Sequence, residues 1–381
     1  MSAGHQVTVI TCAPNFPIGK VFNGYRNRLW QTEDMEGIRV IRVWSYITRN
    51  DGFTKRILDY LSFMVAAFLA ALFVRRVDVI IGTSPQFFTA CAAYATSIVK
   101  RRPWIFELRD IWPESIRTVG AMKGERLLNL LEKLELFLYG KAAAIVVVTN
   151  AFKRNLIGRG IDRAKIYVVT NGVDTSRFTR IPKDEELLAD LNLNDAFVAG
   201  YIGTHGMAHG LDTLIDAAHI LANSELSARI RILMLGDGAH RQRLEDRAKA
   251  EGLNNIRFIN SVPKHDVTRY WSLLDVSIIH LKKSELFTSV IPSKMFECMG
   301  MAIPILHGVE GESAEIVLEY DIGLTFEPEN HTQLVERLIT LHDDWDLRAR
   351  LVNNGPIAAL NYDRRFLAEK MLSIIEDCAL R

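Results

Sequence analysis

The sequence predicts an α/β fold in which two doubly wound domains face a cleft, and three observations lead to this prediction. The chain of 381 residues exceeds the usual size of a single domain. Strand-like and helix-like segments alternate along it, which is typical of parallel sheets covered by helices. A polar, charged stretch at residues 174–190 separates two such series. We therefore expect the ligand site in the cleft between the domains.

The alternation assigns residues 1–180 to a first domain and 181–362 to a second. A last amphipathic helix falls within 363–381, and we expect it to pack back on the first domain. In the first domain, strands are predicted at residues 6–11, 38–43, 77–81, 104–107, 144–148 and 166–169, with helices at 55–74, 87–99, 124–139 and 151–159. In the second, strands are predicted at 198–202, 230–235, 256–259, 276–279, 304–306 and 323–326, with helices at 211–222, 239–250, 266–274, 293–299 and 331–341.

The beginning of the sequence departs from the usual plan of such a domain. A doubly wound domain opens with a strand, a Gly-rich turn and a helix, and that first strand lies centrally in the sheet. Here Gly4 and His5 run straight into the strand at 6–11, as if a first helix ended there. A missing central strand would leave two unpaired edges inside the sheet. We therefore expect that the sequence lacks an N-terminal strand with its Gly-rich loop and helix.

Composition bears on the kind of binding partner and on the cellular compartment of the protein. A formal net charge of +1, without a basic stripe interleaved with aromatic residues, gives no reason to expect nucleic acid. The four cysteines lie far apart and have no metal-ligand spacing. We expect free thiols in a reducing compartment, and no signal-peptide pattern is visible at the start. The expectation is a cytoplasmic protein.

One apolar run tests for a membrane span. Residues 63–74 are wholly apolar, and Lys55, Arg56, Arg75 and Arg76 flank them. A spanning helix needs roughly 20 apolar residues, so this run is too short. We expect a buried or half-buried helix. The alternative is a helix whose basic ends touch an anionic bilayer surface.

The stretch 291–304 carries the most informative chemistry. Pro292 stiffens the entry to a short helix, and Ser293 is a good N-cap residue. The free N–H groups at such a helix start suit a phosphate, and Lys294 adds a mobile cation. Glu297 can accept two hydrogen bonds from a diol such as a ribose. Together they predict a pocket for a nucleotide-diphosphate sugar, whereas the alternative is an ordinary capped helix that packs its apolar residues into a core.

Several segments in a fixed order then carry a family resemblance. They are Arg109-Asp110-Ile111-Trp112-Pro113-Glu114, Asn171-Gly172-Val173-Asp174 with Phe178, Gly200-Tyr201-Ile202-Gly203 with His209-Gly210-Leu211, Leu235-Gly236-Asp237-Gly238, and Pro292-Ser293-Lys294 through Glu297. The set spans nearly the whole chain. It resembles the family 4 glycosyltransferases, which have the GT-B architecture of two Rossmann-like domains. Within that family it is most similar to bacterial L-fucosamine-type enzymes of O-antigen and capsule assembly.

The resemblance implies a retaining transferase that uses a UDP-sugar donor, with no metal and no cofactor. It implies that the second domain binds the nucleotide and the first binds the acceptor. The sugar would be a hexose or an amino sugar, and the acceptor a saccharide linked to polyprenyl diphosphate. Such an enzyme would serve the synthesis of lipopolysaccharide or capsule at the inner face of the plasma membrane, with the helix at 55–74 near the membrane.

The resemblance also assigns donor-site residues. The backbone of Gly203 would lie against the donor diphosphate, which requires a residue without a side chain. Many relatives carry an Arg after this Gly and a Lys before the later one, where this chain has Thr204 and His209. Lys294, with Lys282 or Lys283, would then have to neutralise the diphosphate. For His205 we favour a simpler explanation, a polar loop residue.

Glu297 matches the second glutamate of the family's paired-glutamate motif, which implies that it holds the donor ribose. The first glutamate should stand eight positions earlier, where this chain has Ser289. Glu285 lies four residues further upstream and need not substitute for it. The contacts that the family's first glutamate makes to the sugar therefore do not transfer to this chain.

Arg109 and Asp110 are candidates for the acceptor and for catalysis, and Asn171 is a further candidate for donor binding. Arg109 and Asp110 follow a predicted buried strand, and charges at the carboxyl end of a parallel strand face the crevice. A His often precedes this Asp in related enzymes, so a general-base function does not transfer to Arg109. Asp110 could orient the acceptor hydroxyl and Arg109 could contact a phosphate, or the two could form a structural ion pair. Asn171 ends a strand where its amide could face the substrate, or it simply forms a turn.

Competing functions remain open on the sequence. A UDP-sugar epimerase could use the same architecture. A non-catalytic or damaged paralogue would explain Ser289, Thr204 and His209. An oxidoreductase is disfavoured because no G-x-G-x-x-G segment follows a strand at the opening of either half.

Overall fold

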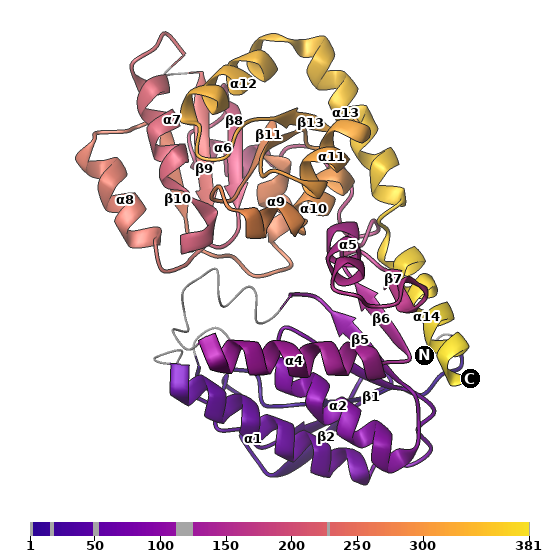
Figure 1. The fold of residues 1–381 in the computed structure, drawn as a ribbon. Helices are drawn as coiled ribbons and strands as arrows, with labels where there is room; N and C mark the ends of the chain where they lie inside the picture. The colour runs from indigo at the N-terminus through magenta and orange to yellow at the C-terminus, as the bar shows by residue number, and fades with distance from the viewer. Residues whose placement is uncertain (1–2, 16–18, 49–52, 112–124, 227–228, 381) are drawn as a thin grey trace. The chain divides into compact units, whose positions relative to one another are not determined.

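The computed structural model describes residues 3–15, 19–48, 53–111, 125–226 and 229–380. The chain forms two compact units, residues 1–169 with 370–381 and residues 170–369 (Figure 1). The division falls between Val169 and Thr170, whereas the sequence placed it after residue 180. Parallel sheets covered by helices confirm the predicted α/β class in both units.

The N-terminal unit contains two sheets instead of one. The first has the order β1-β3-β2, with β1 (Thr8–Thr11), β2 (Trp30–Met35) and β3 (Ile38–Val43). The second is parallel with the order β4-β5-β6-β7, formed by β4 (Ile80–Thr83), β5 (Trp104–Leu108), β6 (Ala144–Val147) and β7 (Ile166–Val168). Strand β2 was not predicted. It forms an antiparallel hairpin with β3 around Glu36 and Gly37, both at positive φ.

Each of these two sheets ends in an edge strand. Within the described residues, β1 pairs only with β3 and β4 pairs only with β5, so each is an edge strand. Val9 of β1 and Ile81 of β4 are correspondingly exposed, at 41% each.

Helices cover both sheets of this unit. They are α1 (Phe53–Leu72), α2 (Phe87–Lys100), α4 (Glu125–Lys141), α5 (Asn150–Gly158), a 3₁₀ turn at Arg163–Lys165, and the end of α14 (Arg364–Ala379). Helix α1 is the predicted apolar helix, and it buries Phe63 and Ala67 against Ile41 of β3. None of the helices in the described part of the chain is long and apolar enough to cross a membrane. Ile374 and Cys378 of α14 share a core cluster with Ile105 and other residues of β5 and β6.

A buried carboxylate ties α4 to α5. Glu135 is 1% exposed, and it accepts hydrogen bonds from Tyr139 Oη at 2.6 Å and from Arg159 Nη2 at 2.8 Å. Burial raises the pKa of Glu135 to about 7, although Tyr139 and Arg159 both act to lower it. The guanidinium therefore compensates a charge that the core would otherwise disfavour.

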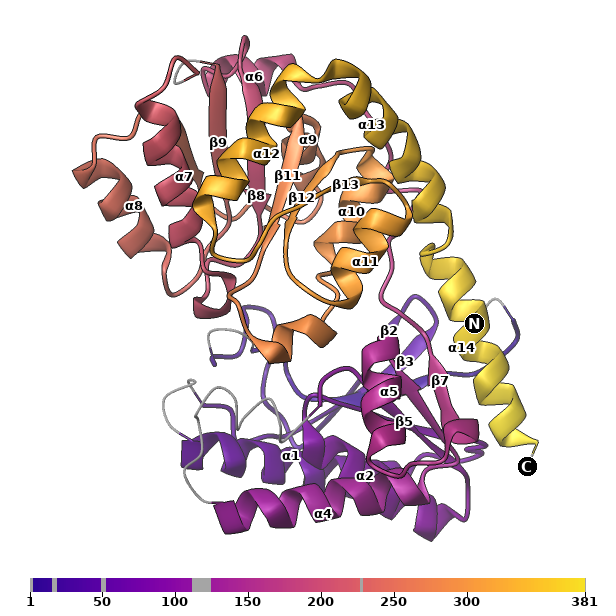
Figure 2. The ribbon, with the colours of Figure 1, turned by 45° about the horizontal axis from the view of Figure 1, so that its top comes forward.

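The C-terminal unit contains one six-stranded parallel sheet with the order β10-β9-β8-β11-β12-β13. The strands are β8 (Phe197–Ile202), β9 (Ile230–Leu235), β10 (Ile256–Ile259), β11 (Val276–His280), β12 (Ile305–Gly308) and β13 (Gly323–Thr325). The helices are α6 (Glu185–Asp190), α7 (Asp212–Ala222), α8 (Arg241–Ala250), α9 (Val267–Ser272), α10 (Lys294–Met301), α11 (Glu312–Glu319), α12 (His331–Asp343) and α13 (Trp345–Leu360), with 3₁₀ turns at Met207–His209 and Glu285–Ser289. Helices surround the sheet (Figure 2). Helices α9 and α10 share one hydrophobic core cluster with the strands, and α7 and α12 share another. Strand order reverses between β8 and β11, and ligands of such sheets bind at this switch point.

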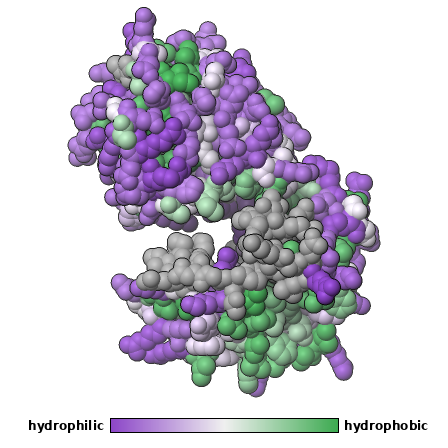
Figure 3. Space-filling model, turned by 60° about the vertical axis from the view of Figure 1, so that its left-hand side comes forward, coloured by the Kyte–Doolittle hydropathy of each residue, from purple (hydrophilic) through white to green (hydrophobic). Residues whose placement is uncertain are grey.

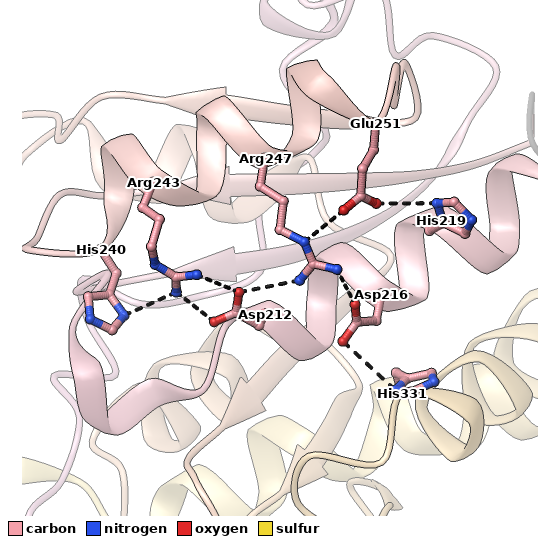
Figure 4. Close-up of polar contacts among 8 residues, drawn as sticks. All are labelled: Asp212, Asp216, His219, His240, Arg243, Arg247, Glu251 and His331. Carbon is pink, nitrogen blue, oxygen red and sulfur yellow. Dashed lines mark hydrogen bonds and ion pairs between the residues drawn. The ribbon is translucent and has the colours of Figure 1, made fainter.

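A network of ion pairs fixes α7 against α8 on the surface of this unit (Figure 4). Asp212 pairs with Arg243 at 2.6 Å, and Asp216 pairs with Arg247 at 2.5 Å. Arg247 also contacts Glu251 at 2.7 Å. Exposed pairs contribute little singly, but here one arginine bridges two helices. The network holds the start of α7, which directly follows the loop after β8.

We predict that Arg159→Met destabilises the protein by about 3–5 kcal/mol, because it leaves Glu135 buried without its counter-charge. The folded-state pKa of Glu135 lies above its ordinary value of 4.5, so the folded state gains stability when the carboxyl is protonated and loses it as pH rises through about 7. The loss in Arg159→Met should therefore be larger at pH 8 than at pH 5. Urea unfolding at both values checks this.

The control is Arg159→Met combined with Glu135→Gln, which removes the charge together with its partner. This double variant should regain most of the lost free energy of unfolding. A double variant as unstable as Arg159→Met at pH 8 would show that packing, not charge, sets the effect.

Candidate functional site

The candidate site lies where the loops after β8 and β9 meet the beginning of α10. The two loops are joined through their backbones. Gly203 N–H donates to Leu235 O at 2.9 Å, His205 N–H donates to Asp237 O at 2.8 Å, and His240 N–H donates to His205 O at 2.9 Å. This pairing fixes the loop at 203–211 next to the switch point of the sheet.

Two glycines of the β9 loop allow the loops to come this close. A Cβ added to Gly236 would lie 1.8 Å from Gly203 O, and one added to Gly238 would lie 2.6 Å from His205 O. Their φ values of +145° and +155° also disfavour other residues. These glycines therefore serve the backbone geometry of the two loops.

Lys294 provides the charge of the site. Its ammonium nitrogen lies 3.8 Å from the centre of the Tyr201 ring, a cation–π distance. It also occupies the space beside Gly203, because a Cβ on that glycine would lie 2.6 Å from Nζ. Nζ is buried and has no hydrogen-bond partner within the described residues. Burial lowers the pKa of Lys294 to about 8, against the opposing influence of Cys298 and Glu297.

Two histidines, His205 and His209, also lie against the Tyr201 ring. His205 is fully buried, and neither of its ring nitrogens has a hydrogen-bond partner among the described residues. His205 lies in a loop, as expected, and the structure adds that its ring is buried. Nδ1 of His209 is likewise buried and unpaired. Burial lowers the pKa of each ring to about 4, with Arg241 and Lys294 adding to this for His205 and Lys294 for His209.

The buried donors of Lys294, His205 and His209 need hydrogen-bond partners that a ligand could supply. A neutral imidazole carries one N–H donor, and an ammonium carries three. Buried donors in folded proteins are almost always paired, so unpaired ones mark a place where a ligand or water belongs. Since Lys294, His205 and His209 all lie around the ring of Tyr201, the missing partner is an acceptor of hydrogen bonds, and the lysine favours an anion.

His280 holds the loop after β8 through a hydrogen bond to His209, and the sequence analysis did not identify it. Its Nδ1 lies 2.7 Å from His209 O, and its Nε2 lies 2.8 Å from Glu329 N. Since Glu329 N–H must donate, Nε2 is the acceptor and Nδ1 carries the proton. The ring stacks on Phe326 at 5.7 Å. The sequence did contain a signal for this residue, because His280 directly follows a predicted buried strand.

The other residues predicted near the diphosphate are not part of this buried cluster. Thr204 and the side chain of Lys282 are exposed, although Lys282 N–H donates to Ala208 O at 2.9 Å. Lys283 is engaged with Glu327, at 2.6 Å between Nζ and Oε1. Of the three lysines proposed for neutralisation, Lys294 therefore lies inside, Lys282 lies at the rim and Lys283 is ion-paired.

The beginning of α10 differs from the prediction in one respect. Ser293 has helical dihedrals, φ −60° and ψ −27°, and makes no side-chain cap hydrogen bond, so it is not the expected side-chain N-cap. Pro292 O accepts Met295 N–H at 3.0 Å, so the helical turn already begins at Pro292. Ser293 is exposed, and its hydroxyl is available to a ligand.

Glu297 lies one turn further along α10 and is half-buried. Burial raises its pKa, while Lys294 and Arg364 act to lower it. Ser289, at the position of the absent glutamate, donates its hydroxyl to Leu286 O at 2.9 Å within a 3₁₀ turn. Glu297 is thus the acidic side chain that α10 provides near Lys294.

The residues proposed for the acceptor belong to other parts of the chain. Arg109 and Asp110 follow β5, and their backbone N–H groups donate to Ser84 Oγ at 2.9 and 3.3 Å. Trp112, Pro113 and Glu114 of the same motif lie outside the described residues. Asn171 belongs to the C-terminal unit, where Val173 N–H donates to Tyr362 O at 2.9 Å. No group of three or more metal-ligating side chains occurs within the described ranges.

Comparison with known proteins gives consistent results for both halves. Residues 1–177 match the family model described as Glycosyltransferase Family 4, and residues 183–357 match the model of Glycosyl transferases group 1. A curated relative is the putative colanic acid biosynthesis glycosyl transferase WcaI of Escherichia coli (strain K12). It is 25% identical over 303 residues, which cover 77% of this chain and 72% of the relative.

Solved structures show the same fold at low identity. HepE of Anabaena, crystallised with UDP-glucose, aligns with a TM-score of 0.70 and 17% identity over 97% of this chain and 100% of its own. Sucrose-phosphate synthase of Thermosynechococcus elongatus aligns with a TM-score of 0.74 and 16% identity over 99% and 90%. A trehalose-phosphate synthase of Burkholderia vietnamiensis gives 0.74 and 13% over 98% and 99%.

The buried ammonium predicts an unusual stability effect. Lys294→Met should raise the free energy of unfolding of the ligand-free protein by about 1–3 kcal/mol at pH 7, because it removes an unpaired buried charge. The folded-state pKa of Lys294 is about 8 and its ordinary value is 10.5, so the penalty is complete below pH 8 and disappears as pH rises toward 10.5. Urea unfolding between pH 7 and pH 10 measures both effects.

Lys264→Met, which changes an exposed lysine of the same unit, is the matched control and should leave stability unchanged. A Lys294→Met variant that is less stable than the wild type at pH 7 would mean that the ammonium is already compensated in the folded protein.

Proposed function

Because the chain belongs to the family 4 glycosyltransferases, we propose that it is a retaining enzyme with a UDP-sugar as donor and a saccharide as acceptor. It would transfer a hexose or an N-acetylhexosamine. Two facts support the donor class. The fold is that of HepE, which was crystallised with UDP and with UDP-glucose. The C-terminal unit also carries an unpaired buried cation at its topological switch point.

The observation that carries the proposal is the unpaired ammonium of Lys294. A diphosphate placed against Gly203 would give Nζ its missing acceptor and would keep the lysine charged. The neutral rings of His205 and His209 can each donate one hydrogen bond to phosphate oxygens without adding charge. As the sugar leaves, negative charge develops on the diphosphate, and a fixed cation stabilises it there. We propose no metal and no cofactor in this step.

The other residues act around this centre. We propose that Glu297 accepts hydrogen bonds from the two ribose hydroxyls, which its raised pKa does not prevent because both carboxyl oxygens retain lone pairs. Ser293 and the first N–H groups of α10 would contact the diphosphate from the side. Thr204, Lys282 and Pro292 would lie at the rim of the donor site, and Asn171 would contribute its amide.

Arg109 and Asp110 would serve the acceptor side. We propose that Asp110 orients the acceptor hydroxyl and that Arg109 binds a phosphate of the acceptor. A polyprenyl-diphosphate-linked saccharide presents both groups. The likeness to a putative colanic acid glycosyl transferase supports cell-surface polysaccharide synthesis, such as O-antigen, lipopolysaccharide or capsule, at the cytoplasmic face of the plasma membrane.

Calorimetry with UDP tests the donor site. Lys294→Met should weaken UDP binding by about 10- to 100-fold, the loss expected for one hydrogen-bonded charge. Glu297→Ala should weaken it severalfold, and Glu297→Gln, which keeps one acceptor oxygen, should lose less. Lys264→Met is again the matched control. Wild-type affinity in Lys294→Met would remove the ammonium from the phosphate site.

The fate of the donor separates transfer from epimerisation. We expect proton NMR of UDP-glucose, UDP-galactose and their N-acetylhexosamine analogues to show no epimer when the enzyme is present without acceptor. With polyprenyl-diphosphate-linked saccharides added, one donor should be consumed and the new linkage should keep the donor's α configuration. A C2 or C4 epimer formed without acceptor would contradict transfer, and a β linkage would contradict retention.

A further inference from the structure

Helix α1 of the N-terminal unit is apolar on two opposite faces. One face is buried, with Phe63 at 7%, Ala67 at 7% and Ala70 at 2% exposure. The opposite face carries aliphatic side chains at helical spacing, which are Leu58, Val65, Leu69 and Leu72 with exposures of 51%, 52%, 51% and 38%. A surface helix normally presents polar residues to solvent, so the apolar outer face of α1 indicates a specific function.

The exposed apolar surface continues past the end of α1. Phe73 is 75% exposed and lies edge-on to Trp30 at 6.1 Å between ring centres. Ile98 and Val99 at the end of α2 are each 57% exposed. Lys100 Nζ donates to Val74 O at 2.7 Å, which holds the ends of α1 and α2 together. Figure 3 shows hydrophobic residues gathered on the surface of the N-terminal unit.

Two arginine pairs adjoin this surface. Arg75 and Arg76 directly follow Val74, and Arg101 and Arg102 directly follow α2. All four are exposed, and none has an ion pair among the residues that the structure describes. Exposed apolar side chains beside unpaired guanidinium groups suit a surface that offers hydrocarbon and phosphate together.

We propose that the outer face of α1, with Phe73, Trp30 and the ends of α2, docks on an anionic phospholipid bilayer. This surface is called the lipid-facing patch below. The apolar side chains would enter the boundary between headgroups and acyl chains, and the four arginines would bind lipid phosphates. The proposal deepens the proposed function, because an acceptor linked to polyprenyl diphosphate is presented at a membrane surface.

A second copy of the chain fits the patch less well. A two-fold dimer would place the same patch on both sides of the interface. Four arginines of one copy would then approach four of the other, with no carboxylates among the patch residues to compensate them. A bilayer rich in phosphatidylglycerol offers the opposite charge at high density.

Vesicle co-sedimentation of the full chain tests the proposal. We expect binding to phosphatidylglycerol–phosphatidylethanolamine vesicles at least tenfold stronger than to phosphatidylcholine vesicles. Leu69→Glu with Phe73→Glu should reduce it at least tenfold, as should Arg75→Glu with Arg76→Glu, since each arginine near an anionic surface contributes about fivefold. The matched controls lie in the C-terminal unit and should bind as the wild type does: Leu360→Glu, 65% exposed, and Arg180→Glu with Arg337→Glu.

Three outcomes would overturn the proposal: no preference of the wild type for anionic vesicles, equal losses in the controls, or sedimentation velocity showing that the patch variants dissociate a dimer without changing vesicle binding. Circular dichroism checks that each variant is folded. UDP affinity, measured on the same samples, should be equal in all of them. Lost UDP binding in the wild type would contradict the proposed function and leave the vesicle result to decide the patch by itself.

Discussion

The ammonium of Lys294 is the constraint around which the C-terminal unit is arranged. It is buried against the Tyr201 ring and beside Gly203, and the folded protein gives it no hydrogen-bond acceptor. A charge in that position costs free energy, as the lowered pKa of the lysine records. The chain tolerates the cost, which is typical of a site whose partner arrives as a ligand. The tight backbone pairing of the β8 and β9 loops holds Gly203 in place beside the ammonium.

The charge balance of the site follows from the same arrangement. Thr204 carries no charge, and both site histidines are neutral near pH 7 because burial lowers their pKa to about 4. Among the described residues of the buried site, Lys294 is therefore the cation without a hydrogen-bond acceptor, whereas Arg241 donates to Gly236 O and Ile259 O. A second positive charge would lower the pKa of Lys294 further and weaken the very group that binds the anion. Replacing charge by neutral donors avoids this repulsion, at the expense of the Coulomb attraction that a second cation would add.

Much of this could be predicted from the sequence. The alternation of apolar segments predicted the parallel sheets, and Gly236 and Gly238 could be assigned to backbone geometry because tight turns between strand and helix need them. Strand β2 was missed because its sequence, WQTEDM, is polar and its pairing depends on the turn at Glu36 and Gly37. The burial of His205 was also missed. It depends on the β9 loop folding over the β8 loop, a contact between segments about thirty residues apart that no local pattern encodes.

In the N-terminal unit, the sequence likewise did not show which side chains tertiary packing would bury. The apolar run at 63–74 was correctly assigned to a helix, but the sequence could not show which face would be covered. Only the packing of α1 on β3 and α2 reveals that a second apolar face stays exposed. The division of the strands of this unit into two sheets likewise became visible only in the strand order.

The titration of Lys294 tests the central claim most directly. Its amine can be followed by NMR in protein with ¹³C- and ¹⁵N-labelled lysine, with Lys294→Met to assign the signal. We predict a pKa of about 8 in the free protein and a rise to above about 10 when UDP is bound, because the diphosphate supplies the missing counter-charge. A pKa near the ordinary value of 10.5 in the free protein, or one that UDP leaves unchanged, would contradict the account.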